Sequence, residues 1–442
     1  MWTEAKTLRD AGWAVSVISP KGEGASSWHE RLEGIDIYRY PLPTTAAGLL
    51  AHLAEYAVAV PATLLLAALV RLRGRVDVVH ACNPPDLFFP IGRAFKRLGA
   101  AFIFDQHDLA PEIYLAQGGR RGGLLHRILL WCEQQTYRTA DVVLATNESY
   151  RRIAIERANV DPQRVVVVRS SPDLARIHRV QPRRELKSER EHLVVYLGTM
   201  GPQDGVDMFL RAARVVADQR PGSVRFVAIG NGNQQAALRR LCVELGLQAD
   251  VAFTGRIPDA EVREFLSTAD VGVSPDPANG FNEFCTMNKT LEYMACGVPV
   301  VAFDLAETRV SAGNAAVYAE PNDPAALAAA ILQLLDDPQR RLRMREEGLR
   351  RILGPLSWRA SAESLIRAYS FAVGEAVPRG VDVQAVPISP ESPIPVAMDR
   401  VAGDGDLSPA VRPPIHLPRS GHAADAKNAS ATPAGEPPGR RG

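Results

Sequence analysis

Short apolar runs rich in β-branched residues alternate along the chain with segments whose apolar residues recur at helical spacing. The alternation breaks near residue 173 and restarts near residue 192. Strands and helices in this order indicate an α/β fold with a parallel, doubly wound sheet, and the restart predicts two such domains facing a cleft. The predicted strands are 13–19, 76–81, 100–105, 141–146 and 164–169, then 192–198, 224–230, 251–255, 271–275 and 298–303.

Composition sets the domain boundaries. We expect a first domain over 1–172, a charged linker over 173–191, a second domain over 192–354 and a final helix over 355–373. Residues 374–442 hold 12 of the 33 prolines and no apolar period. We therefore expect this Pro/Ala/Gly-rich tail to be disordered.

One segment of the first domain, residues 49–70, is unusually apolar and runs into a cluster of arginines. Pro61 and nearby polar residues interrupt it, leaving 15 uncharged residues from Tyr56 to Val70. A spanning helix needs about 20. We interpret residues 49–75 as a pair of amphipathic helices that lie on a membrane surface, with the arginines facing anionic lipid. The alternative is an ordinary buried helix pair.

Charge and cysteine content narrow the class of protein. The net charge is +1, so bulk electrostatics gives no reason to expect nucleic-acid binding. Five cysteines lack C-x-x-C spacing and histidine neighbours, which predicts buried free thiols in a reducing, cytoplasmic compartment. They are Cys82, Cys132, Cys242, Cys285 and Cys296. The start of the chain shows a charged helical pattern instead of a signal peptide.

The stretch NEFCTMNKTLEYMACGVPVVAF, residues 282–303, is the most informative in the chain. It predicts a helix over 288–296, ended by Gly297 and followed by a buried strand. Lys289 and Glu292 share one face at the start of this helix. A helix N-terminus with a lysine for phosphates and a carboxylate for ribose hydroxyls suits a nucleoside diphosphate. The alternative is an i,i+3 surface ion pair, worth about 0.2–0.5 kcal/mol.

Eight motifs, taken in order, resemble one family. They are EAKTLRDAGWAVSVIS, VHACNPPD, FDQHDLAPEIY, ADVVLATNESY, YLGTMGPQDGVD, AIGNG, FTGRIP and MNKTLEYMACGVPVVAFDLAE. Together they resemble glycosyltransferase family 4 (group 1), which has the GT-B fold, and within it the branch that assembles bacterial surface polysaccharides. The resemblance covers about residues 1–372.

The resemblance implies transfer of a hexosyl or N-acetylhexosaminyl group from a nucleotide-sugar donor, by default a uridine one. The acceptor is a saccharide or a polyprenyl-linked saccharide, and anomeric configuration is commonly retained. The second domain binds the donor, the first receives the acceptor, and the final helix near 358–373 crosses back onto the first domain. No cofactor is implied, and a peripheral position on the inner face of the cell membrane follows for a lipid-linked acceptor.

The resemblance also assigns donor-binding residues. Glu292 holds the ribose hydroxyls, Lys289 lies at the diphosphate, and both count with His107 as catalytic. The other donor residues are Gly198 and Thr199 at the phosphates, Arg256 and Ile257 at the nucleobase, Glu283 at the sugar, and the backbone of Thr286, Met287 and Asn288.

On the acceptor side, His107 matches the histidine that touches the transferred sugar near its reacting carbon. The alternative for His107 is a loop histidine that hydrogen-bonds locally. Asp86, Asp108 and Glu112 are candidates for holding acceptor hydroxyls, although Asp86 after a proline also suits a simple turn.

The chain departs from the family at three places. Phe284 stands where the family has a sugar-binding glutamate, so either Glu283 substitutes or the sugar is recognised differently. The loop after Gly198 carries Asp204 where arginine or lysine is common. The first strand before the opening helix is missing, which would leave two neighbouring strand edges unpaired. We expect that Met1 is a misassigned start and that an upstream segment supplies this strand.

Metal help is not expected, because the D-x-D sequence of this chain lies in the tail at 404–406. Two other functions remain open from the residues. One is a nucleotide-sugar epimerase on the same architecture, and the other is an inactive sugar-nucleotide-binding scaffold. A dinucleotide oxidoreductase is disfavoured, because no G-x-G-x-x-G follows a strand.

Overall fold

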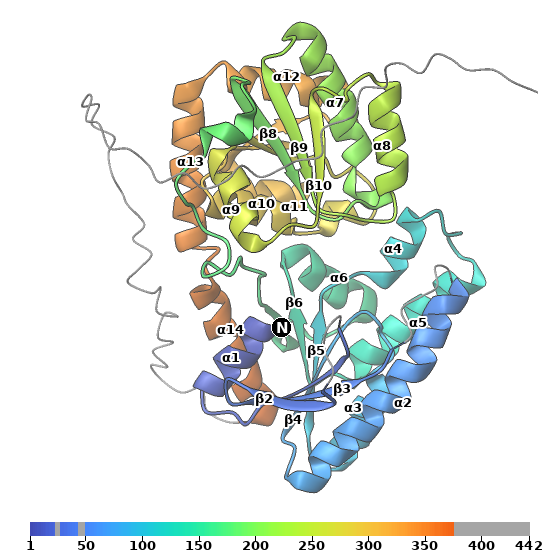
Figure 1. Ribbon diagram of the computed structural model, residues 1–442. Coiled ribbons are helices and arrows are strands. Elements are labelled where there is room, and N and C mark those ends of the chain that lie inside the picture. Colours follow the sequence, from blue (N-terminus) through green and yellow to red (C-terminus); the bar gives the residue numbers. More distant parts are fainter. Residues whose placement is uncertain (23–26, 43–48, 375–442) are drawn as a thin grey trace, which may run out of the picture. The chain divides into compact units, whose positions relative to one another are not determined.

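The computed structural model describes residues 1–22, 27–42 and 49–374, and the side chains of these except at 49–53. The predicted disorder of 374–442 therefore falls, apart from Gly374, outside the described residues. Within the described part, the strands form three sheets. Figure 1 shows the ribbon with its elements labelled.

The first half of the chain carries a three-stranded sheet, ordered β1-β3-β2, and a four-stranded parallel sheet, ordered β4-β5-β6-β7. Its elements are α1 (Trp2–Asp10), β1 (Ser16–Pro20), β2 (His29–Leu32), β3 (Ile35–Tyr40), α2 (Leu49–Arg73), β4 (Val78–Cys82), α3 (Phe89–Arg97), β5 (Ala101–Gln106), α4 (Ala110–Ala116), α5 (Leu124–Thr139), β6 (Val142–Ala145), α6 (Glu148–Ala158) and β7 (Val165–Val167). The strands β1 and β4 each lie at the edge of their own sheet.

The second half carries one six-stranded parallel sheet, ordered β10-β9-β8-β11-β12-β13. Its elements are β8 (His192–Leu197), α7 (Val206–Gln219), β9 (Val224–Ile229), α8 (Gln235–Glu244), β10 (Val251–Gly255), α9 (Asp259–Thr268), β11 (Val271–Ser274), α10 (Asn288–Ala295), β12 (Val300–Phe303), α11 (Ala306–Ala312), β13 (Ala316–Ala319), α12 (Pro324–Leu335), α13 (Pro338–Leu353) and α14 (Trp358–Val373). Short 3₁₀ turns lie at Pro162–Arg164, Arg184–Lys187, Pro202–Asp204, Asn282–Phe284 and Gly313–Ala315.

The six-stranded sheet is buried on both faces, which explains its continuous apolar strands. Along β8, Val194 and Tyr196 enter one core while Leu193 and Val195 enter the other. Helices α7 and α12 cover the first face, and α9 and α10 contribute to the second. Parallel strands bring their carboxyl ends to one edge, so the loops after them are neighbours.

The final helix α14 packs against the sheet of the first half, where the resemblance places it. Leu365 and Tyr369 share a core with residues of β5 and β6. The Trp358 indole donates to the Thr7 hydroxyl of α1 at 2.8 Å. The last helix of the described chain therefore completes the core of the first half.

The predicted strand bounds are correct to within about three residues, but two features of the sheets were missed and one helix prediction was wrong. The pattern missed the antiparallel pair β2–β3 and the edge strand β13. Residues 49–73 form one helix, not two, with Pro61 inside it. Proline is compatible with helical φ and costs one hydrogen bond, so a long apolar helix continues through it.

Two glycines let the donor-side loops approach closely. A Cβ on Gly230 would lie 1.9 Å from the Gly198 carbonyl oxygen, and the φ of Gly230 is +124°. A Cβ on Gly205 would lie 1.9 Å from the Pro275 carbonyl oxygen. The loops after β8, β9 and β11 are therefore packed backbone against backbone, which only glycine permits.

We predict that Gly230→Ala destabilises the protein by roughly 2 kcal/mol or more, because a side chain adds a steric clash to a left-handed backbone. Thermal unfolding of the full chain measures this. Gly280→Ala is the matched control, because nothing lies within 4 Å of its added Cβ. Equal melting temperatures for the two variants would contradict the proposed backbone packing.

Candidate active site

Lys289 lies in the first turn of α10 and is held by acidic side chains from two other loops. Its ammonium donates to Asp276 in a short contact and lies 3.8 Å from Asp204. It also lies 5.4 Å from the ring centre of Tyr196 on β8. The Lys289 residue is only 8% exposed. A buried ammonium requires such partners, so Lys289 joins α10 to the loops after β8 and β11.

Glu292 lies one turn further along α10 and has a different partner. Arg176, from the segment that joins the two halves, donates to a Glu292 oxygen at 3.1 Å and also bonds Asp259. Burial raises the pKa of Glu292, while the Arg176 charge opposes the rise. The two predicted clamp residues thus share a face but are partnered separately, so the i,i+3 ion pair is not their arrangement.

The loop after β8 is ordered around Asp204. The Thr199 hydroxyl and the Gly201 amide both donate to one Asp204 oxygen, at 3.1 and 2.9 Å. A Cβ on Gly198 would lie 3.2 Å from Lys289 Cε, so the loop touches the lysine. Asp204, a departure from the family pattern, therefore has a structural partner in Lys289.

The predicted nucleobase residues follow β10. Arg256 is exposed, and Ile257 packs against the second core cluster. Gly230 pairs with Gly255 in an isolated bridge, so this loop lies next to the loop after β9. Arg256 therefore lies at the same edge of the sheet as Gly198 and Lys289.

The segment before α10 contacts the first half of the chain. Asn147, at the start of α6, donates to the Phe284 carbonyl at 2.8 Å and to the Thr286 hydroxyl at 3.1 Å. Phe284 packs against a core cluster of the first half. Glu283 accepts from the Ala306 amide at 3.2 Å. The phenylalanine that replaces the family's glutamate thus serves packing.

The helix cap completes this region. Met287 is the N-cap of α10 and is buried, whereas Asn288, the first helical residue, is exposed. The exposed amide end of α10 offers N–H groups that lack intrahelical partners. Such an end is a ready site for an anion.

His107 belongs to a network centred on Asp105, a buried residue of β5. One Asp105 oxygen accepts from His107 Nε2 at 2.7 Å and from His80 Nε2 at 3.2 Å. His80 contacts the Tyr369 hydroxyl of α14 through its other nitrogen at 2.8 Å. Burial alone would lower the pKa of His107, but the charge of Asp105 and its hydrogen bond outweigh burial and raise the pKa. His107 is therefore an oriented, not a free, loop histidine.

The acidic candidates for acceptor binding converge on Asn83. The Asn83 side chain donates to Asp86 at 3.0 Å and to the Asp108 carbonyl at 2.7 Å, and it accepts from the His107 amide at 2.7 Å. Burial raises the pKa of Asp86 to about 7. Glu112 is paired with Arg157, which also bonds Glu133 at 3.0 Å. The structure therefore brings Asp86, Asp108 and His107 together, with Glu112 close enough to affect Asp86.

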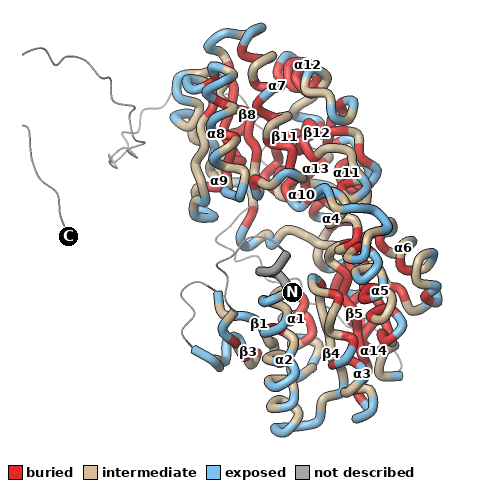
Figure 2. The backbone as a smooth tube through the Cα atoms, turned by 90° about the vertical axis from the view of Figure 1, so that its right-hand side faces the viewer, coloured by how far each residue is buried: buried red, intermediate tan, exposed pale blue. Residues whose placement is uncertain are grey.

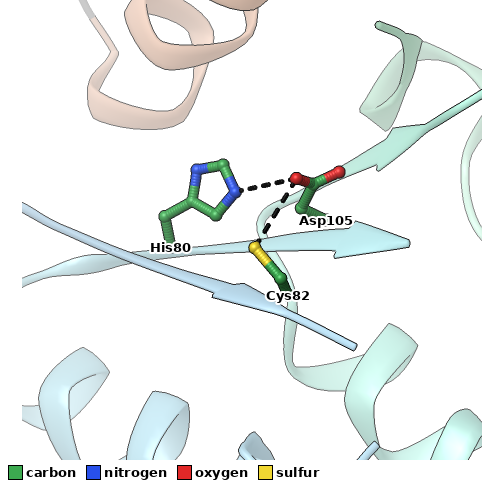
Figure 3. Close-up of side chains that lie close together, drawn as sticks. All are labelled: His80, Cys82 and Asp105. Atoms are coloured by element: carbon green, nitrogen blue, oxygen red, sulfur yellow. Dashed lines mark hydrogen bonds and ion pairs between the residues drawn. The ribbon is translucent and has the colours of Figure 1, made fainter. Parts of the chain in front are cut away.

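The same polar cluster contains two groups of side chains of metal-binding type. His80, Cys82 and Asp105 form one, shown in Figure 3, and Glu4, Asp105 and His107 form the other. In each group the ligand atoms lie within 4.8 Å of one another. Cys82 also contacts Asp105, at 3.6 Å. These are the described residues that could hold a divalent ion.

The strand register connects the two predicted sites. Gln106 of β5 is opposite Ala145 of β6, so His107 and Asn147 leave the sheet at neighbouring positions. Asn147 in turn bonds the segment that precedes α10. The Asn147 side chain thus bonds the segment before α10 from a strand end that neighbours that of His107.

The sequence prediction missed several residues that organise the site. They are Asn83, Asp105, Asn147, Arg176 and Asp276. A polar residue directly after a buried strand is a usable signal for Asp276 and Asn147, since ligands bind beyond strand ends. Arg176 carries no such signal, because its partners lie far along the chain.

The comparisons with known proteins assign the chain to an enzyme class. Residues 191–337 match the family model "Glycosyl transferases group 1", and residues 2–170 match "Glycosyl transferase 4-like domain". The chain belongs to the group 1 glycosyltransferases. Its two Rossmann-like domains are those of the GT-B fold.

Among curated proteins, it is 31% identical over 330 residues to a D-inositol 3-phosphate glycosyltransferase of Thermobispora bispora. That match covers 71% of this chain and 74% of the relative. A protein of the same name from Geodermatophilus obscurus is 31% identical over 320 residues, covering 68% of each chain.

Solved structures confirm the fold. The sucrose-phosphate synthase of Thermosynechococcus elongatus superposes with a TM-score of 0.69 at 20% identity, covering 83% of this chain and 91% of that one. Anabaena HepE in complex with UDP superposes with a TM-score of 0.61 at 15% identity, covering 81% and 100%. The family membership favours a transferase over the epimerase and the inactive scaffold.

We predict that Asp105→Asn lowers the pKa of His107, because the carboxylate charge that raises it is removed. NMR titration of the histidine ring signals measures this. His178 and His192, whose contacts lie elsewhere, serve as internal controls. An unchanged His107 titration in the variant would show that Asp105 does not set its charge. In the wild type, the raised pKa of His107 contributes stability that is complete below the unfolded pKa of the imidazole and declines as pH rises through the raised pKa.

Proposed function

We propose that this protein transfers a hexosyl or N-acetylhexosaminyl group from a UDP-sugar to a hydroxyl of a saccharide carried on a lipid. The proposal places it at the inner face of the cell membrane, in surface polysaccharide synthesis. Transfer retains the anomeric configuration and needs no metal ion. The observation that carries the proposal is the position of Lys289 and Glu292 at the start of α10, beside the backbone-packed loops.

The start of α10 supplies what a diphosphate needs. An ammonium has three donors, and Lys289 donates one of them to Asp276, while Asp204 at 3.8 Å is an ion-pair neighbour beyond hydrogen-bond distance. The other donors are available for a phosphate oxygen, beside the N–H groups of the α10 N-terminus. Glu292, 20% exposed at its side chain, can exchange Arg176 for ribose hydroxyls.

A uridine donor is supported by neighbours in fold only. The Anabaena HepE structures hold UDP and, in another crystal, UDP-glucose. Arg256 and Ile257 lie in the loop where this proposal seats the base. The assignment of donor binding to the second domain, residues 192–354, is part of the same proposal.

The chemistry needs charge stabilisation more than a nucleophile. The bond from the sugar carbon to the phosphate oxygen breaks, the acceptor oxygen bonds to that carbon, and the acceptor proton passes to the leaving phosphate. Lys289, Arg256 and the α10 amides would stabilise the developing phosphate charge. Asp105 holds one ring nitrogen of His107, which leaves Nδ1 to face the sugar.

The charges around His107 favour a neutral saccharide as the acceptor. Asp86, Asp108 and Glu112 surround the region next to His107, and Arg157 is committed to Glu112 and Glu133. Carboxylates accept hydrogen bonds from sugar hydroxyls but repel a phosphate. A second candidate, transfer to a phosphorylated polyol, comes from the names of the relatives, D-inositol 3-phosphate glycosyltransferases. Assaying both acceptor types with one UDP-sugar panel decides between them.

We predict that Lys289→Ala lowers turnover ten- to a hundredfold or more, because a charge-assisted hydrogen bond is worth about 1.5–3 kcal/mol. Glu292→Gln should weaken UDP-sugar binding, which isothermal titration calorimetry measures. Arg343→Ala, at an exposed α13 position, is the control and should change neither.

Lys289→Ala also leaves buried carboxylates unpaired and can unfold the site. Lys289→Met combined with Asp276→Asn removes one positive and one negative charge, so the net charge of the site is unchanged, and it tests the lysine in a folded protein. Full turnover in that double variant would refute the role of Lys289. Product stereochemistry, from the anomeric proton coupling, tests retention in the same reactions.

We predict undiminished turnover in excess chelator, because lysine, arginine and helix amides supply the positive charge. The measurement is the initial rate before and after dialysis against chelator. Loss of activity that a divalent ion restores would contradict metal independence, and would point to the Asp105 cluster as the place to test.

A further inference from the structure

The outward face of α2 is apolar along its length. Side chains of α2 are described from residue 54 onward, and the exposed ones recur at helical spacing. They are Ala54, Ala57, Val58, Pro61, Leu64, Leu65, Ala68 and Leu72, called here the α2 stripe. No charged or hydrogen-bonding side chain is exposed between residues 54 and 72. A surface helix normally turns its polar side outward, so this arrangement is inverted.

The exposure is substantial at the leucines. Leu65 is 70% exposed and Leu72 is 85% exposed. In Figure 2, α2 is drawn mainly in the colours of exposed and intermediate residues. Contiguous exposed apolar surface of this kind marks an interaction site.

The opposite face of α2 is fixed to the protein. Ala59 is buried, and Ala67 packs against the α3 cluster of Ile91 and Phe95. Arg73 donates to the Tyr38 hydroxyl on β3 at 2.6 Å. The window Ala54–Arg73 is long and apolar enough to cross a membrane by composition. A helix packed on one side against its own domain is instead placed to lie along a surface.

Cations flank the stripe. Arg71, Arg73 and Arg75 end α2, and no acidic residue lies among residues 71–75. Arg75 is paired with Asp77 at 2.7 Å, yet its side chain is 81% exposed. Arginines beside an apolar helix face suit anionic headgroups.

Helix α5 adds a second exposed apolar group. Leu124, Ile128 and Trp131 are exposed there, and the Trp131 ring packs edge-on against Phe89 of α3 at 5.6 Å. Arg120, Arg121 and Arg127 are exposed in the same region. Both apolar groups therefore belong to helices that pack on α3, and both have arginines nearby. Tryptophan with arginine is typical of residues at a membrane interface.

We propose that the α2 stripe docks this protein on the surface of an anionic lipid bilayer, with α2 lying in the interface and its arginines at the headgroups. Apolar burial supplies the attraction and the arginines give the preference for negative lipid. It names the surface that would support the membrane placement in the proposed function, and it does not depend on which donor or acceptor is used.

The test is flotation of the full-length protein with vesicles of phosphatidylcholine alone or mixed with phosphatidylglycerol. We expect flotation with the mixed vesicles, weaker flotation with the neutral ones, and a decrease in high salt. Leu65→Asp with Leu72→Asp should weaken binding roughly tenfold or more for each position. Val243→Asp is the control, because Val243 on α8 is 58% exposed and apolar. Unchanged thermal unfolding confirms that the variants are folded.

Four results would overturn the proposal. The wild type could fail to float with either vesicle, or the double variant could float as well as the control. Light scattering could show a dimer without vesicles that the double variant abolishes, together with no vesicle binding, which would make the stripe an interface between two copies. Resistance of the membrane-bound protein to alkaline carbonate extraction would show that α2 spans the bilayer.

Discussion

The candidate donor site depends on a buried ammonium group that three segments share. Lys289 of α10 reaches Asp276 after β11 and Asp204 after β8, while its stem lies against Gly198. A buried charge is tolerated only when it is paired, so the position of each segment is constrained by the other two. Removing either acid would take away one of the two contacts that hold the lysine and would release the loop that it fixes. The α10 N-terminus is thus held in place before any ligand arrives.

A second centre of charge organises the opposite side of the site. One oxygen of Asp105 accepts hydrogen bonds from the imidazoles of His107 and His80, and the Tyr369 hydroxyl of α14 contacts the other nitrogen of His80. Burial would raise the pKa of Asp105, yet the charge and hydrogen bonds of His107 and His80 hold it far below its usual range. The two centres have opposite composition: a lysine between acids on one side, an acid between histidines on the other. Asn147, which follows the strand next to that of His107, hydrogen-bonds the segment before α10.

The sequence was sufficient for most of the fold because each buried strand is a short β-branched run. β8 and β12 are clear in this way, and the helix over 288–295 was recognisable from Gly297 and the strand after it. The pair β2–β3 was missed because its exposed strand β2, HERL, carries no apolar period. The site was less accessible, since ion pairs depend on residues that meet only in three dimensions. Lys289 was identified from its helix position, but its partners were not, because Asp276 lies between two prolines and looks like an ordinary turn.

The close packing of glycine backbones at residues 198 and 230 has a consequence for how such a protein changes over time. Where the floor of a site consists of main-chain atoms, its shape is set by backbone geometry and not by any side chain. A side chain that does not contact that floor can then be exchanged without changing the shape of the floor. A protein family built in this way can keep one scaffold while its members come to differ in the groups that they bind.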